Sequence, residues 1–175
     1  AIKAAVEHAR QLGMNPYVVY DGLEGLIDGK IKEATRELTN DMIYRGGTLL
    51  RYSRSKRFFD YEFRKQAYEH LKERNIDKLI IMGGDGSFRA LNDFFNDFEV
   101  PFAGIPATID NDIAGTDYCL GVDTAQNVIL DCIDSVRDTA RSHHRAFVIE
   151  TMGRDCGYLA MTTALCSAAD ICIVP

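Results

Sequence analysis

Two loops that follow consecutive predicted strands constrain the fold of this chain more than any other feature. An apolar run at residues 79–82 ends in GGDGS (residues 83–87), and a second run at residues 101–105 ends in PATIDND (residues 106–112). A helical segment lies between them, and this order is typical of two parallel strands in an α/β sheet. Because ligands bind beyond the carboxyl ends of parallel strands, we expect the two loops to share one site.

The glycine-rich loop predicts a metal-bound phosphate. Glycines let the backbone approach a ligand, and the next helix directs its first N–H groups at an anion. The carboxylate of Asp85, inside this loop, would repel a phosphate about 4 Å away by roughly 4 kcal/mol at an effective dielectric near 20, and Mg²⁺ removes that conflict. A P-loop lysine is absent, and Arg89 stands where a dinucleotide fingerprint has a small residue. A strand-to-helix turn without a ligand is the alternative.

The second loop predicts a catalytic carboxylate. Thr108, Asp110 and Asp112 alternate, so in an extended segment their side chains point the same way. Such a cluster suits phosphoryl transfer, in which an aspartate deprotonates the attacking hydroxyl, and Asp110 is the candidate base. For Asn111 and Asp112 the alternative is an Asx turn or a helix cap, because both residue types bond readily to nearby backbone.

Three motifs in order, GGDGS, PATIDNDIAGTDY and VIETMGR, make the whole chain resemble the bacterial, ATP-dependent type of 6-phosphofructokinase (phosphofructokinase A family). The resemblance implies an α/β fold with open, mostly parallel sheets flanked by helices, a Rossmann-like three-layer sandwich in two lobes. Residues 1–121 would form the nucleotide-binding lobe without its first strand and first glycine-rich loop. Residues 122–175 would begin a truncated sugar-phosphate lobe. We therefore expect this incomplete chain to be inactive alone.

The implied activity is phosphorylation of fructose 6-phosphate to fructose 1,6-bisphosphate by Mg-ATP, the committed step of glycolysis. Pyrophosphate-dependent relatives carry Asp after GGD and Lys before TIDND, whereas this chain has Gly86 and Ala107. These small residues favour ATP, although Ala107 replaces the glycine that is usual in ATP enzymes. GGDGS alone also resembles NAD kinases and diacylglycerol kinases, but TIDND and MGR do not. A non-catalytic nucleotide-binding regulatory subunit is a further alternative.

The resemblance also implies the role of each site residue. Catalysis is assigned to Thr108, Asp110 and Arg154, and metal binding to Asp85. Nucleotide binding is assigned to Arg54, Gly84, Asp85, Gly86 and Ser87, and sugar-phosphate binding to Thr108, Ile109, Asp110, Arg145, Met152, Gly153 and Arg154. Arg145 would reach the neighbouring subunit's site in a homotetramer. An allosteric effector would bind Arg36, Asp41, Arg137 and Asp170. The chain departs from the family beside Arg54 and, at residues 167–169, before Asp170.

Composition indicates which partners and which cellular compartment to expect. The chain is 46% hydrophobic with a net charge of −6, and it has neither a basic block nor an apolar run of membrane-spanning length. We therefore expect no nucleic acid or membrane partner. The five cysteines form no C-x-x-C pair and are predicted to be reduced core residues of a cytoplasmic protein. Further helices are predicted at residues 2–12, 60–74, 123–141 and 158–166, and further strands at 16–20, 146–151 and 171–174.

Overall fold

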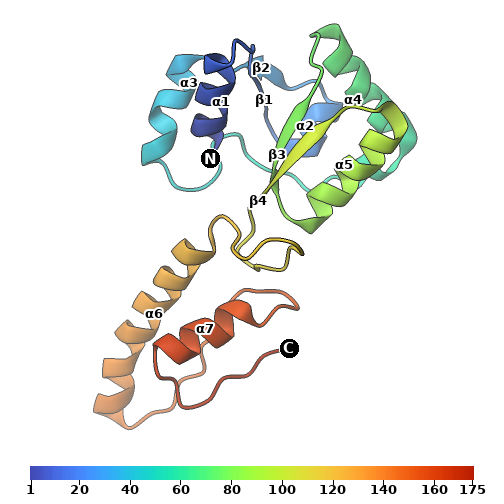
Figure 1. Ribbon diagram of the computed structural model, residues 1–175. Helices are drawn as coiled ribbons and strands as arrows, with labels where there is room; N and C mark the ends of the chain where they lie inside the picture. Colours follow the sequence, from blue (N-terminus) through green and yellow to red (C-terminus); the bar gives the residue numbers. More distant parts are fainter. The chain divides into compact units, whose positions relative to one another are not determined.

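The computed structural model describes the backbone of all 175 residues and the side chain of every residue except Asp41. Contacts within the chain divide it into two compact units, residues 1–80 with 89–103 and residues 81–88 with 104–175. Figure 1 follows the chain from blue to red and labels its helices and strands.

The first unit begins with short helices around a two-stranded sheet. Its elements in chain order are α1 (Ile2–Gln11), β1 (Tyr17–Val19), α2 (Gly22–Ile27), β2 (Ile31–Glu33), α3 (Arg36–Asn40) and the 3-10 turn η1 (Asp41–Tyr44). Val6, Val18 and Ala34 form a buried core between these elements. α1 contributes Val6 to it because apolar residues recur on one face of the helix.

β1 and β2 run antiparallel, with Tyr17 opposite Glu33 and Val19 opposite Ile31. The prediction of mostly parallel sheets therefore does not extend to this pair. The physical reason is the short connection at residues 20–30, because a parallel crossover needs about a dozen residues or more.

Aromatic rings form a second core in the first unit. The 3-10 turn η2 (Arg57–Phe59) and α4 (Tyr61–Glu73) meet the later part of α5 (Asp85–Phe98) here. Phe58 and Phe94 are buried, and their ring centroids lie 5.7 Å apart. Asp60 caps α4 by accepting the N–H of Glu62 at 3.0 Å, which explains where the predicted helix begins.

β3 (Leu79–Gly83) and β4 (Phe102–Pro106) form the second sheet. The N–H of Leu79 donates to the carbonyl of Pro101 at 3.0 Å, and the N–H of Ala107 donates to the carbonyl of Gly83 at 2.9 Å. Because the paired residues advance in the same direction, the strands are parallel, with α5 as their connection. The chain is an α/β protein, as the sequence predicts (Figure 1).

Two helices and the loops around them make up most of the second unit. These helices are α6 (Val122–His143) and α7 (Tyr158–Cys166), and they pack against each other. Cys119, Val122 and Leu159 form the buried core. Ile109 and Ile113, from the loop that follows β4, pack against that core. The core of the second unit therefore packs against the acidic loop as well as the two helices.

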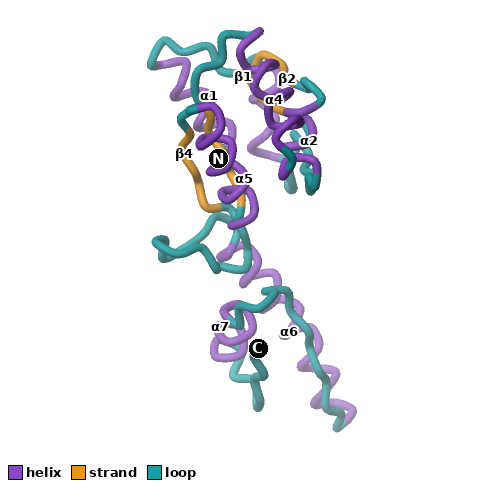
Figure 2. Tube along the Cα trace, turned by 90° about the vertical axis from the view of Figure 1, so that its right-hand side faces the viewer, coloured by secondary structure: helices purple, strands orange, loops and turns teal.

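The strands predicted at residues 146–151 and 171–174 are not formed. Both segments are irregular and lie in the teal loops on either side of α7 in Figure 2. Their apolar side chains are exposed, 99% for Val148 and 84% for Ile173. A strand requires a hydrogen-bonded neighbour, and in the part of the chain that the structure describes these segments pair with none.

The cysteine prediction is partly wrong. All five thiols are free, but only Cys119 is buried among them; Cys132, Cys166 and Cys172 are exposed, and Cys156 is intermediate. Cys132 lies on the solvent side of α6, and Cys172 lies in a segment that forms no strand, so neither reaches a core. Among the described residues, no helix combines the length and apolar character that crossing a membrane requires.

Candidate functional site

The glycine-rich loop occupies the turn from β3 into α5. The Gly84 carbonyl accepts the N–H groups of Ser87 at 3.0 Å and Phe88 at 3.2 Å, which starts the helix. A Cβ built on Gly83 would lie 2.8 Å from the Ser87 Oγ, so a larger residue here would require the Ser87 side chain to move. The opposite holds for Gly86, where a Cβ would meet no atom within 4 Å. The loop is therefore tight against the helix and open at Gly86.

Asp85 stands in the first turn of α5, where the helix dipole stabilises a carboxylate. Its side chain is half-buried and already has an interaction partner within the chain. The N–H groups of Ser87 and Phe88 are bonded to the Gly84 carbonyl, and it is the positive end of the helix dipole that makes this end of α5 suited to an anion.

The acidic loop lies directly against the glycine-rich loop. The N–H of Ala107 donates to the carbonyl of Gly83 at 2.9 Å. A Cβ built on Gly84 would lie 3.6 Å from the Thr108 Cβ, which is van der Waals contact. The two loops are therefore neighbours at the carboxyl ends of β3 and β4, as the order of the strands predicts.

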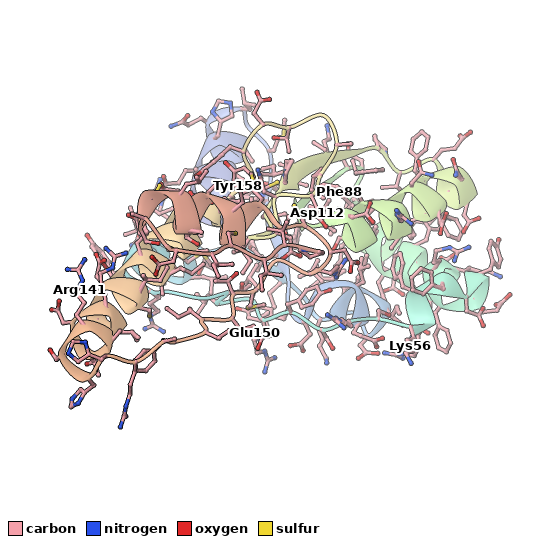
Figure 3. The ribbon with its side chains drawn as sticks, turned by 90° about the horizontal axis from the view of Figure 1, so that it is seen from below. Lys56, Phe88, Asp112, Arg141, Glu150 and Tyr158 are labelled. Carbon is pink, nitrogen blue, oxygen red and sulfur yellow. The ribbon has the colours of Figure 1, made fainter. Side chains whose placement is uncertain are left out.

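The acidic loop is bent, whereas the alternation of its side chains predicts an extended segment. Thr108 Oγ1 accepts the N–H of Asp110 at 3.3 Å, and Asn111 has a φ of 54°, in the left-handed region. The expectation of an extended segment is therefore wrong for this loop, and alternation does not decide where these side chains point. Thr108 and Asp110 are half-buried, and Asp112, labelled in Figure 3, is exposed.

Asn111 holds this loop together. Its Nδ2 donates to the carbonyl of Asp117 at 3.2 Å, and its Oδ1 accepts the N–H of Cys119 at 2.9 Å. The local Asx turn considered from sequence would bond within about two residues, whereas these partners are farther along the chain. Sequence reasoning missed this role, because nothing local marks Cys119 as the partner of Asn111.

Residues 152–154 lead into a tight turn that differs from the two loops above. Gly153 is buried with a φ of 142°, and its carbonyl accepts the N–H of Cys156 at 2.9 Å. A Cβ on Gly153 would lie 2.6 Å from the Cys156 carbonyl oxygen, so glycine is required here. Met152 and Arg154 are exposed on either side. Among the described side chains, Arg154 forms no ion pair, so its guanidinium is available to a ligand.

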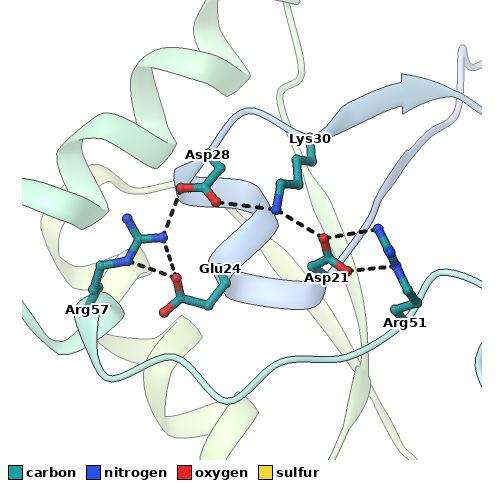
Figure 4. Close-up of polar contacts among 6 residues, drawn as sticks. All are labelled: Asp21, Glu24, Asp28, Lys30, Arg51 and Arg57. Carbon is teal, nitrogen blue, oxygen red and sulfur yellow. Dashed lines mark hydrogen bonds and ion pairs between the residues drawn. The ribbon is translucent and has the colours of Figure 1, made fainter.

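Arg54 lies in the first unit, in a segment that carries four cations. Figure 4 shows that its neighbours are held by carboxylates of the α2 region. Arg51 pairs with Asp21 at 2.9 Å. Arg57 pairs with Glu24 and, at 2.8 Å, with Asp28. Arg54 is exposed between these two anchors.

The ion pairs of Arg57 change the titration of their partners. Hydrogen bonds from Arg57 are the main cause that lowers the pKa of Glu24 and the pKa of Asp28. Lys30, which lies 3.1 Å from Asp21 and 3.4 Å from Asp28, has a raised pKa because both carboxylates bond to it. Lys30, between Asp21 and Asp28, therefore joins the two arginine anchors to each other.

The remaining predicted positions are dispersed. Arg145 is exposed just beyond α6, and its N–H closes that helix on the Ala140 carbonyl at 3.0 Å. Of the effector positions, Arg36 is exposed at the start of α3 in the first unit, and the side chain of Asp41 lies outside the described side chains. In the second unit, Arg137 donates to the Ser167 carbonyl at the end of α7, and Asp170 is exposed.

No group of three or more His, Cys, Asp or Glu side chains among the described residues is arranged to hold a metal ion by itself. Mg²⁺ does not need such a group, because it keeps several waters and binds through one or two carboxylates together with substrate phosphates. Asp85, beside a helix start that suits phosphate, fits that mode of binding.

Comparison with known proteins matches residues 1–175 to the family model described as Phosphofructokinase. The chain is 58% identical over its whole length to the ATP-dependent 6-phosphofructokinase of Sulfurimonas denitrificans, of which it covers 55%. It is 45% identical to the ATP-dependent 6-phosphofructokinase 2 of Bacteroides thetaiotaomicron, of which it covers 54%. The chain thus spans about half the length of the curated relatives it matches.

Solved structures agree with these matches. Phosphofructokinase from Saccharomyces cerevisiae aligns with 97% of this chain at a TM-score of 0.89 and 34% identity, over 26% of its own length. A pyrophosphate-dependent phosphofructokinase from Marinobacter aquaeolei aligns with 94% of this chain at a TM-score of 0.74, over 43% of its own length. At 22% identity, that second likeness concerns the fold alone.

Proposed function

Because the chain belongs to the phosphofructokinase family, we propose that it serves the transfer of the γ-phosphoryl group of ATP to the 1-hydroxyl of fructose 6-phosphate. The product is fructose 1,6-bisphosphate, and the reaction is the committed step of glycolysis. The observation that carries the proposal is that Gly84 lies beside Thr108, close enough for a Cβ built on Gly84 to touch it, so that a loop suited to phosphate adjoins a loop that bears a candidate base. Phosphoryl transfer requires both parts side by side.

Asp110 is the proposed base. It follows Thr108 closely in the loop, and its N–H is fixed by the Thr108 hydroxyl at 3.3 Å. A carboxylate in this position would accept the proton of the sugar hydroxyl as the phosphoryl group arrives. Arg154 is proposed to stabilise the charge on the transferring group through a bidentate grip. Ile109, Arg145, Met152 and Gly153 complete the proposed sugar-phosphate contacts.

Mg²⁺ and ATP are the proposed cofactor and donor. Asp85 would hold the metal, which would supply positive charge to the phosphates when bound. Gly84, Gly86 and Ser87, which lie at the start of α5 or just before it, would line those phosphates, and Gly86 leaves open space for them. Arg54 is proposed to bind a nucleotide phosphate from the first unit.

Pyrophosphate is the alternative donor. The open space around Gly86 supports ATP, because a carboxylate there would occupy room that a nucleotide needs and would repel its phosphates. The names of the curated relatives, ATP-dependent enzymes at up to 58% identity, point to the same donor. Turnover measured with ATP and with pyrophosphate separates the two: we expect ATP to support the reaction, and a preference for pyrophosphate would overturn the choice of donor.

A non-catalytic nucleotide-binding subunit is the other alternative, and Asp110→Asn distinguishes it from an enzyme. In the full-length protein that carries this chain, we expect kcat to fall by about 10²- to 10⁴-fold with little change in ATP affinity, because general-base catalysis contributes that much. Asp131→Asn makes the same change on the exposed side of α6 and should keep the parent kcat. A parent without turnover, or an Asp110→Asn variant that keeps the parent kcat, would contradict the proposal.

The same family membership supports three further proposals. The protein is a cytoplasmic homotetramer. An allosteric effector binds it through Arg36, Asp41, Arg137 and Asp170. Residues 1–121 and 122–175 belong to a nucleotide-binding and a sugar-phosphate-binding lobe. Size-exclusion chromatography with light scattering tests the tetramer, and titration of activity with ADP at low fructose 6-phosphate tests the effector.

A further inference from the structure

The amide of Asn111 uses both of its ends to cross-link the acidic loop. Nδ2 donates to the Asp117 carbonyl at 3.2 Å, and Oδ1 accepts the Cys119 N–H at 2.9 Å. We propose that Asn111 is a positioning residue that sets the direction of the Asp110 carboxylate. This inference rests on the proposed phosphoryl transfer, in which Asp110 is the base.

The anchor at the far end of this cross-link is firm. Cys119 is 2% exposed, and it packs with Val122 and Leu159 in the core of the second unit. The next residue, Leu120, donates its N–H to the Pro106 carbonyl at 2.9 Å, which closes the loop where it leaves β4. The amide of Asn111 is therefore tied to a buried part of the fold.

The cross-link reaches Asp110 through the peptide that joins it to Asn111. On one side, the N–H of Asp110 donates to Thr108 Oγ1 at 3.3 Å. On the other side, Asn111 is held in a left-handed conformation with a φ of 54° by its two bonds. Fixing the backbone on both sides of Asp110 fixes its Cα–Cβ direction. Asn111 suits this position because it tolerates a positive φ and offers both a donor and an acceptor.

Three substitutions separate the hydrogen bonds from the backbone conformation. Asn111→Ala removes both bonds and strains the left-handed backbone. Asn111→Gly also removes both bonds but accepts the positive φ. Asn111→Asp keeps an acceptor for the Cys119 N–H and loses the donor to Asp117. The position of the carboxylate depends on the bonds, so Ala and Gly should have similar effects and Asp should restore part of the function.

The expected kinetic result is a loss in kcat with little change in KM. A base that is misplaced by about 1 Å can cost about 10²-fold, so we expect kcat to fall by about 10- to 100-fold in Asn111→Ala and Asn111→Gly. Both KM values should stay within about threefold, because the change affects the transition state more than substrate binding. Asn127→Ala is the matched control, since Asn127 Nδ2 also donates to a backbone carbonyl, that of Asp123 at 2.8 Å, but on the exposed side of α6.

Hydrogen exchange tests the cross-link independently of catalysis. In the full-length protein that carries this chain, the peptide covering residues 113–121 should exchange faster in Asn111→Ala and Asn111→Gly than in the parent, because the Cys119 N–H loses its acceptor. Asn111→Asp should keep most of the protection, and Asn127→Ala should match the parent throughout.

The two measurements distinguish the inference from the proposed function. An active parent whose Asn111→Ala and Asn111→Gly variants keep the parent kcat would refute the positioning role and leave the proposed function intact. Unchanged exchange in both variants would refute it as well, whatever the activity. A parent without kinase activity would refute the proposed function and, with it, the role assigned to Asn111. Faster exchange together with the loss of kcat supports the inference.

Discussion

Leu159→Ala should destabilise the second unit and loosen the acidic loop. Leu159 is fully buried in α7 and packs with Cys119 and Val122 in the core that also receives Ile109 from that loop. Replacing its isobutyl side chain by a methyl group leaves a cavity beneath the loop that carries the candidate base. Stability and loop order should therefore fall together.

The magnitude follows from the burial. Leu159 has 0% exposure, so the substitution removes about three buried carbon groups, worth about 0.8 kcal/mol each. That gives about 2.4 kcal/mol, and a residual cavity adds about 24 cal/mol per Å³, which brings the usual range for Leu→Ala to about 2–5 kcal/mol. Leu165 lies on the same helix but is 75% exposed, so Leu165→Ala should cost less than about 0.5 kcal/mol.

Native-state hydrogen exchange is the suitable assay, because a protein with more than one cooperative unit does not yield a single unfolding free energy. Peptides from α7 and from residues 109–121 should lose about 2–5 kcal/mol of opening free energy in Leu159→Ala. The same peptides should be nearly unchanged in Leu165→Ala. Equal effects of the two substitutions would refute the reasoning, because they would show that the buried position contributes no more than the exposed one.

Two other perturbations have defined outcomes. Gly153→Ala should cost about 1–3 kcal/mol, because its φ of 142° is strained for alanine and the new Cβ would meet the Cys156 carbonyl oxygen. Exchange of peptide 151–157 measures this cost. Gly46→Ala, where a Cβ has open space, is the control, and the peptide that covers residue 46 should keep the parent exchange. Arg57→Gln should make the free energy of unfolding of the first unit depend less on pH in the acid range. The folded-state pKa values of Glu24 and Asp28 lie below their ordinary 4.5 and 3.8, so the stabilisation they give is present at neutral pH and is lost as pH falls below those values. Between about pH 6 and pH 3, the urea midpoint of the first unit should therefore change less with pH in Arg57→Gln than in the control Lys56→Gln. An equal pH dependence of the two midpoints would contradict the role assigned to Arg57.

Elements with strong local signals were predictable from sequence. α7 begins and ends as expected, and β3 and β4 lie within about one residue of their predicted bounds. An apolar run followed by glycine or proline defines such a strand without reference to distant residues. The contact between Gly84 and Thr108 follows from the same information, because neighbouring parallel strands deliver their loops to one edge.

Features that depend on distant partners were not predictable. The segments at residues 146–151 and 171–174 have the composition of strands, but they have no paired neighbour among the described residues. The alternation of Thr108, Asp110 and Asp112 predicts an extended segment, whereas the loop is bent and the amide of Asn111 bonds to backbone as far along as Cys119. Composition predicts which residues favour a strand or a turn, and tertiary contacts decide between them.

The ion pairs of the arginine-rich segment at residues 51–57 also depend on distant partners and were not predictable from sequence. The cations at residues 51–57 suggest an anion site if each is counted as free. Arg51 and Arg57 are instead committed to carboxylates that stand about 30 positions earlier in the sequence. Among the described side chains, Arg54 and Lys56 form no ion pair, so at most these two remain for a ligand. Arg54 and Lys56 both lie between the anchored arginines, and the assignment of Arg54 to a nucleotide phosphate stays a prediction that the ion pairs leave open.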